Sequence, residues 1–212
     1  MNSINLSNLS AQVECYKILV RLFDMPEAGV HDNRKLYNDL IKATGYLKPK
    51  ALELAKKLRK TIADVSIEDL TSEYRRLLGG SEIVLANPSC DFYFSNRENT
   101  AGSQAWVREF YEIAGFRYEP EIHSPCHIST ELRFIGYLLD QITNEFNRNN
   151  LPNVNHFGDL RCRFVHEHMI LWVPEFTRCI LYNSKSPFYL QLAILLRTLL
   201  VTCSGEEENP DE

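Results

Sequence analysis

Apolar residues recur every three or four positions along most of this chain, which is the spacing that gives an α-helix one apolar face. One clear example runs from Leu9 through Val13, Tyr16 and Val20 to Phe23. Glycine and proline are scarce, with 9 of each in 212 residues, too few for a turn-rich all-β chain of this length. The sequence therefore predicts an all-α fold, a single-domain helical bundle of about eight helices.

Capping residues, glycines and prolines set the predicted ends of these helices. Ser7 or Ser10 caps a first helix, which ends before Pro26. Ser66 opens the fourth helix, Gly115 stops the fifth, and Pro187 lies at the first position of the last. The other helices are predicted at about 32–45, 48–64, 66–79, 100–114, 125–146, 156–182 and 186–203, with a kink or a break at Pro174. Residues 81–98 show no clear period and are predicted to form an ordered loop. Residues 1–203 make up the predicted helical domain, and the charged segment 204–212 is predicted to be a disordered tail.

The bulk composition disfavours several classes of function. The net charge is −5 and the isoelectric point is about 5.7, whereas a nucleic-acid-binding surface normally appears as a basic excess. The six cysteines include no C-x-x-C pair, so ribbon-type zinc sites have no support. The N-terminus lacks a basic segment followed by an apolar run, and no apolar run is long enough to cross a bilayer. We therefore expect a cytoplasmic protein with reduced thiols and no stable membrane insertion.

The stretch SPCHISTELRF, residues 124–134, allows several chemical interpretations. Cys126 and His127 are a potential nucleophile and base, but neighbouring helical side chains diverge by about 100°, which disfavours direct proton transfer. His123, Cys126, His127 and Glu131 could instead ligate a metal, although no second pair of ligands has the usual spacing. A purely structural interpretation makes Ser124 the cap and Pro125 the first residue of a helix. A further interpretation is a polar patch that recognises a peptide with a basic head and an apolar body.

Four segments in the same order carry a resemblance to a known family. They are EYRRLLGG (73–80), NPSCDFY (87–93), FY (110–111) with AGF, PCHI and ELRF (114–134), and HMILWVPEF (168–176). Together they resemble the motifs E-Y-x-x-L-F-x-G, P-x-E-S-x-Y, F-Y-x-x-x-G with P-D-H-I-x-x-E-L-x-F, and H-L-x-x-W-x-P-x-F of the TorD/DmsD/NarJ family of molybdoenzyme maturation chaperones. The resemblance covers roughly residues 10–203.

The resemblance implies a cytoplasmic chaperone, not an enzyme, that works without a cofactor or resident metal. Such a chaperone binds the twin-arginine signal peptide or the apo form of a molybdopterin oxidoreductase catalytic subunit, and holds it for cofactor insertion before export or assembly. The chain itself is expected to be a monomer or a homodimer. A twin-arginine peptide offers two guanidinium groups and then an apolar run, so its site needs carboxylates beside a hydrophobic groove.

The predicted groove lies between the 86–94 loop and the start of the helix at 125. The predicted peptide-binding residues are Asp91, Phe92, Tyr93, Glu121, His123, Cys126, His127 and Glu131. Two departures from the family pattern affect this site: Cys126 replaces an aspartate, and the loop glutamate is also replaced, which leaves Asp91 as the nearest acid. The alternative hypothesis is a metal- or thiol-dependent enzyme centred on His123, Cys126, His127 and Glu131.

Overall fold

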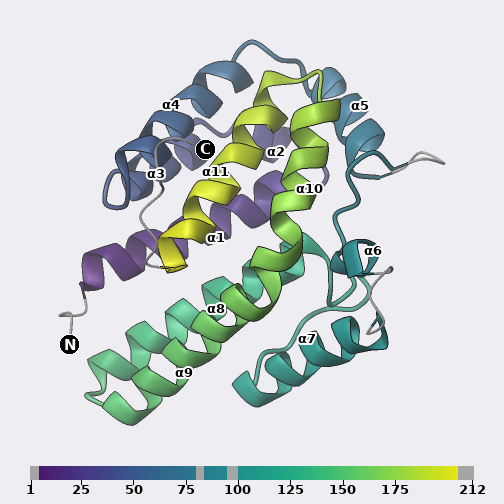
Figure 1. The fold of residues 1–212 in the computed structure, drawn as a ribbon. Helices are drawn as coiled ribbons and strands as arrows, with labels where there is room; N and C mark the ends of the chain where they lie inside the picture. Colours follow the sequence, from purple (N-terminus) through teal and green to yellow (C-terminus); the bar gives the residue numbers. More distant parts are fainter. Residues whose placement is uncertain (1–4, 80–83, 95–99, 205–212) are drawn as a thin grey trace, which may run out of the picture.

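The computed structural model describes residues 5–79, 84–94 and 100–204, and within these ranges the chain is built almost entirely of helices (Figure 1). The helices are α1 (Leu6–Phe23), α2 (Ala28–His31), α3 (Arg34–Thr44), α4 (Pro49–Ile62), α5 (Ile67–Leu77), α6 (Cys90–Phe94), α7 (Thr100–Ala114), α8 (Ile128–Asn147), α9 (Leu151–Phe164), the π-helix η1 (Val165–Met169), α10 (Ile170–Asn183) and α11 (Pro187–Ser204). The predicted all-α class is confirmed. More helices are present than the eight expected, because α2 and α6 are short and the long seventh segment is divided.

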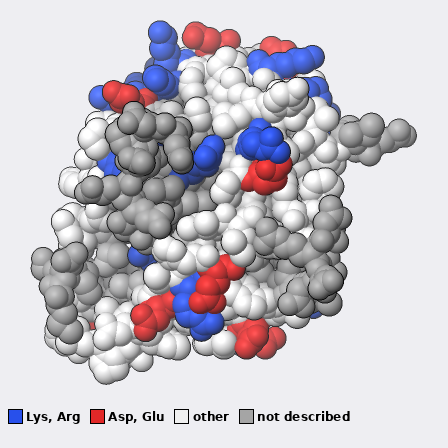
Figure 2. All heavy atoms as spheres, in the orientation of Figure 1, with Lys and Arg blue, Asp and Glu red and all other residues white. Residues whose placement is uncertain are grey.

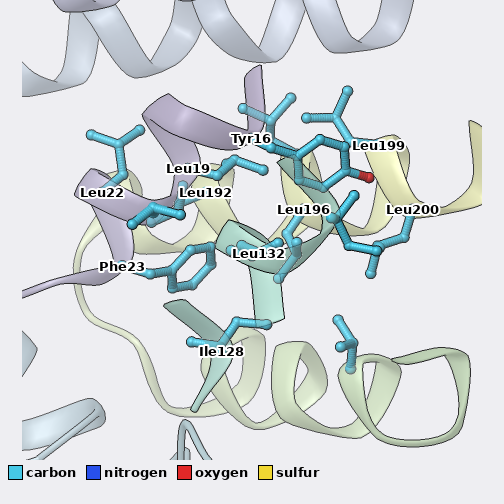
Figure 3. Close-up of a cluster of buried hydrophobic side chains, with 14 of the residues drawn as sticks. Tyr16, Leu19, Leu22, Phe23, Ile128, Leu132, Leu192, Leu196, Leu199 and Leu200 are labelled. Atoms are coloured by element: carbon cyan, nitrogen blue, oxygen red, sulfur yellow. The ribbon is translucent and has the colours of Figure 1, made fainter. Parts of the chain in front are cut away.

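Helices α1, α8 and α11 surround the centre of the bundle. Helix α1 packs along α8, α9 runs beside α8, and α11 packs on α4 and α10 (Figure 1). Figure 3 shows how their side chains meet, with Tyr16, Leu19 and Phe23 from α1 next to Leu132 from α8 and Leu196 from α11. These side chains are almost completely buried, as the apolar spacing predicted for the first and last helices.

Local capping signals account for several helix ends. Ser66 caps α5 by accepting a hydrogen bond from the Asp69 N–H at 3.0 Å, as predicted, and Pro187 is the first residue of α11. The predicted stop at Gly115 is also found, because this residue has a φ of +71°, which favours glycine. The predicted cap of α1 at Ser7 or Ser10 is wrong: the Asn5 side chain accepts the N–H of Asn8 at 3.2 Å.

The predicted break at Pro174 lies elsewhere. Pro174 is inside α10, and the division falls at η1, where the Ile170 N–H bonds to the Val165 carbonyl five residues earlier. A proline donates no hydrogen bond and crowds the carbonyl four residues before it, which here belongs to Ile170. The wider turn thus ends at the residue that the proline would crowd. It also carries His168 into the interior, where that side chain is buried.

A buried carboxylate connects α5 to the segment that precedes α11. Glu73 accepts hydrogen bonds from the Lys185 N–H at 2.6 Å and the Ser184 hydroxyl at 3.1 Å. It also forms a bidentate ion pair with Arg76. Burial opposes ionisation of Glu73, but the hydrogen bonds from Arg76 and Lys185 outweigh it and lower the pKa of the carboxyl. Glu73, which begins the first family-like motif, is therefore a structural anchor and not an exposed helix residue.

None of the helices in the described ranges is both long and apolar enough to span a bilayer. The tail predicted to be disordered spans residues 204–212. Residues 205–212 lie outside the described part of the chain.

Candidate functional site

The two segments predicted to form the groove lie against each other and are joined through their backbones. The Cys90 N–H donates to the Cys126 carbonyl at 2.9 Å, and the Ile128 N–H donates to the Pro88 carbonyl at 2.8 Å. Ser89 and His127 thus form an isolated antiparallel bridge. Residues 87–94 and 123–128, called here the loop junction, make one continuous structure.

Helix α8 starts later than predicted, and its N-cap is His127. The backbone of His127 is extended, with φ −75° and ψ 139°, and its Nδ1 accepts the N–H of Ser129 at 3.2 Å. The predicted cap at Ser124, with Pro125 as first helical residue, is wrong, because the bridge between Ser89 and His127 keeps this segment out of the helix. Cys126 therefore lies outside the first turn of α8. In that first turn, the helix dipole would have lowered the pKa of its thiol.

The two histidines of the loop junction stack face to face, with ring centroids 3.9 Å apart and an interplanar angle of 2°. The His123 Nε2 donates to the Asp24 carboxylate at 2.9 Å, and Arg133 reaches the other oxygen of Asp24 at 3.2 Å. Burial lowers the pKa of His127 to about 3; its neighbours His123 and Arg133 act in the same direction, and the Asp24 carboxylate opposes them. His127 is therefore a neutral hydrogen-bond acceptor at physiological pH.

Glu131 lies inside the protein and is fully buried. Its two oxygens accept hydrogen bonds from the His168 Nε2 at 2.8 Å and the Trp172 Nε1 at 3.1 Å. Burial raises the pKa of Glu131 against the lowering effect of these two donors. Glu131 thus points toward η1 and α10, whereas His127 caps α8 within the loop junction.

The four residues of the alternative metal or thiol site do not converge on one point, although His123 and His127 stack on each other. His123 bonds to Asp24, Glu131 bonds to His168, and Cys126 faces Cys90. The structure groups other donors instead. The Cys90 sulfur lies within 4.8 Å of Glu131 and His168, and also of Asp91 and Cys126.

Sequence reasoning did not identify Cys90 or His168 as site residues. His168 and Trp172 lie four positions apart, a spacing that places two residues on the same face of a helix. This spacing could have indicated that both side chains point toward the same partner. Nothing in the sequence pairs Cys90 with Cys126, because only the backbone bridge between two distant loops does so.

Exposed apolar and acidic side chains lie in the loop junction and next to it. Phe92 is 56% exposed and Ile122 is 52% exposed, and Glu119 and Glu121 are also exposed next to Ile122. Tyr93 is half-buried and stacks on Trp172 with ring centroids 5.6 Å apart. Asp91 accepts a hydrogen bond from Gln104, and its carboxylate is half-buried.

A cavity of about 460 Å³ opens next to Tyr93, between α10 and α11. Its lining combines apolar and charged side chains, which are Tyr93, Leu171, Pro174, Glu175, Arg178 and Arg197. A space-filling view of the face formed by these helices shows Lys and Arg interspersed with Asp and Glu, with uncharged surface between them (Figure 2). The described residues on this face therefore form no broad basic area of the kind that binds a phosphate backbone.

Of the eight predicted peptide-binding residues, the structure thus leaves Phe92 and Glu121 exposed, and Asp91, Tyr93 and His123 partly accessible. His127 is mostly enclosed, and Cys126 and Glu131 are completely buried. Their assignment to peptide binding stays a prediction. Direct contact of a peptide with Cys126 or Glu131 requires the loop junction to open.

Comparison with known proteins identifies the family. Residues 46–178 match the family model described as nitrate reductase delta subunit. A crystal structure from Archaeoglobus fulgidus, described as that of a redox enzyme maturation protein, has a similar fold, with a TM-score of 0.52, 22% sequence identity, and coverage of 90% of this chain and 93% of that chain. No curated protein sequence matches the chain. Since the family model spans more than half of the chain, the chain belongs to the nitrate reductase delta subunit family, the NarJ- and TorD-type group of redox-enzyme maturation chaperones.

Proposed function

We propose that this protein is a non-catalytic cytoplasmic chaperone that binds the twin-arginine signal peptide, or the apo form, of a molybdopterin oxidoreductase catalytic subunit. It holds this client until the cofactor has been inserted. Family membership supports the general role in redox-enzyme maturation. The finer proposal depends on one observation, which is the placement of exposed carboxylates and exposed apolar side chains around the loop junction.

The chemistry of the surface suits such a peptide. Glu119 and Glu121 are exposed and free to turn toward a guanidinium group, which carboxylates bind through paired, charge-assisted hydrogen bonds. Phe92 and Ile122 provide apolar area for the hydrophobic run that follows the arginines. These two kinds of group lie on segments that the backbone bridge holds together. A peptide with a basic head and an apolar body can therefore contact both at once.

Calorimetry with a synthetic twin-arginine signal peptide tests the proposal. We expect binding that weakens with added salt, since exposed ion pairs are screened. A peptide with both arginines replaced by lysine should bind more weakly, because lysine lacks the planar fork of donors. If neither peptide produces heat, and neither competes with the other, the proposed peptide site is wrong.

Two variants localise the site, and each has a matched control. Phe92→Ala should weaken binding about fivefold or more, the usual effect of removing an aromatic anchor. Leu151→Ala is its control, because Leu151 is 57% exposed but lies at the start of α9, at the far end of the bundle (Figure 1). Glu121→Gln should reduce both the affinity and its salt dependence, whereas Glu53→Gln, an exposed acid on α4, should change neither. Equal effects of the site and control variants would place the peptide elsewhere.

A further inference from the structure

Two cysteines that are distant in sequence face each other inside the loop junction. Cys90 begins α6 and Cys126 precedes the cap of α8, and the Cys90 N–H donates to the Cys126 carbonyl at 2.9 Å. Their sulfur atoms lie within 4.8 Å of each other, and both side chains are completely buried. No described helix separates them, since the backbone bridge between Ser89 and His127 sets them side by side.

Cys90 and Cys126 are the residues next to the Ser89–His127 bridge, and a backbone hydrogen bond joins them directly. Residues opposite each other in an antiparallel pair have Cα atoms about 4.5–5.5 Å apart. A disulfide accepts Cα separations of about 4.4–6.8 Å and requires the sulfurs to approach to about 2 Å. Because the backbones are already paired, the sulfurs can close the remaining gap mainly by rotation about the two Cα–Cβ bonds.

We propose that Cys90 and Cys126 are a thiol–disulfide switch that fastens the 87–94 loop to the start of α8. In the reduced state, the loops are held by hydrogen bonds and side-chain packing. In the oxidised state, a covalent bond prevents their separation. The consequence for client binding rests on the proposed function: segments that carry predicted peptide-binding residues on both sides of the loop junction can then no longer move apart.

The oxidant is a low-molecular-weight disulfide, of the class to which oxidised glutathione belongs. One cysteine thiolate attacks this disulfide, forms a mixed disulfide with one half and releases the other half as a thiol. The second cysteine then attacks the mixed disulfide and releases the second half. The two cysteines lose two protons and two electrons in total, and the oxidant is reduced to two thiols.

The surroundings of the pair make this exchange depend on opening of the loop junction. The thiol of Cys90 has its pKa raised by its hydrogen bond to Cys126 and by burial. The hydrogen bond from Cys90 lowers the pKa of Cys126, but burial and the charge of Glu131 raise it overall. Since only a thiolate attacks a disulfide, the closed structure protects both thiols. The disulfide therefore forms when the loops open and the thiols reach solvent. It persists after the loops close again, until a reductant breaks it.

Intact-mass analysis of the full-length protein tests the switch. The reduced protein is incubated with excess oxidised glutathione, in water and in urea at concentrations below the unfolding transition. The urea promotes transient opening of the loop junction, which exposes the buried thiols to the oxidant. We expect a species that has lost two hydrogen atoms and has two fewer thiols open to alkylation. Proteolysis should release a fragment that links the Cys90 peptide to the Cys126 peptide, and a reductant should separate them.

Matched variants identify the bond. Cys90→Ser and Cys126→Ser should each abolish the linked fragment, whereas Cys162→Ser, which removes an exposed cysteine on α9, should retain it. Amide hydrogen exchange over residues 87–94 should slow in the oxidised protein. Absence of the linked fragment in every urea concentration, or unchanged exchange after the bond forms, would overturn the inference. Because these measurements contain no peptide, their failure is distinct from a failure of the proposed client binding.

Discussion

Replacement of His127 by asparagine separates two roles that the structure gives to this side chain. The imidazole caps α8 by accepting the Ser129 N–H, and it is also held neutral because burial lowers its pKa to about 3. An asparagine side chain is a good N-cap but carries no titratable group. His127→Asn should therefore keep the cap and remove the titration, whereas His127→Ala should remove both.

The magnitude follows from proton linkage. In the unfolded chain a histidine takes up a proton near pH 6.5, but His127 in the folded protein does not do so until about pH 3. The unfolded state consequently binds one more proton as the pH falls through this window, and the folded state loses up to about 1.4 kcal/mol of stability per pH unit. Between pH 6.5 and 4.5, we expect the wild-type protein to lose about 2 kcal/mol relative to His127→Asn. Asp24 does not interfere, because its pKa is lowered and it stays ionised over that range.

Urea unfolding, followed by tryptophan fluorescence at several pH values from 4.5 to 7, measures the effect. The free energy of unfolding of wild type should decline more steeply with falling pH than that of His127→Asn. His127→Ala should show the shallow slope of the asparagine variant, but lie about 1 kcal/mol lower at every pH because the cap is lost. If the wild-type and asparagine proteins have the same slope, burial does not keep His127 neutral and the reasoning is refuted.

Three further variants test the interior and the turns. Glu131→Ala should destabilise the protein by about 3–5 kcal/mol in urea unfolding, because it leaves the buried N–H donors of His168 and Trp172 without an acceptor; a cost below about 1 kcal/mol would contradict this role. Gly115→Ala should cost about 1 kcal/mol in the same assay, since the φ of +71° strains an L-residue while the added Cβ meets only an ordinary contact; no loss of stability would argue against that backbone conformation. Asn149, with φ of 56° between α8 and α9, should tolerate glycine with little change in melting temperature, whereas valine should lower it by several degrees; equal melting temperatures would contradict the left-handed conformation.

Local sequence signals predicted most of the helices because those signals act over a few residues. The Ser66 cap, Pro187 at the first position of α11 and the Gly115 stop each depend on neighbouring backbone groups only. The same logic failed at Ser124 and Pro125, which have the chemistry of a helix start. There, the bridge between Ser89 and His127 moves the start of the helix three residues later, from 125 to 128, and that bridging partner is distant in sequence.

The sequence likewise predicted one part of the candidate site and missed another. The motifs placed the 86–94 loop and the 123–131 segment in one functional region, and the structure does bring them together. They could not show which side chains point inward. Glu131 is buried because His168 and Trp172, from η1 and α10, provide its hydrogen bonds, and η1 itself was not visible in the apolar pattern.

The sequence by itself determined that this protein is helical, roughly where most helices lie, and which family its motifs resemble, because periodicity and short motifs are local properties. The tertiary structure alone decided the chemistry of the loop junction. It converted Cys126 and His127 from a possible nucleophile and base into a buried thiol facing Cys90 and a neutral helix cap. The physical reason is that hydrogen-bond partners and desolvation come from segments far apart in the chain, and both are set only when those segments pack.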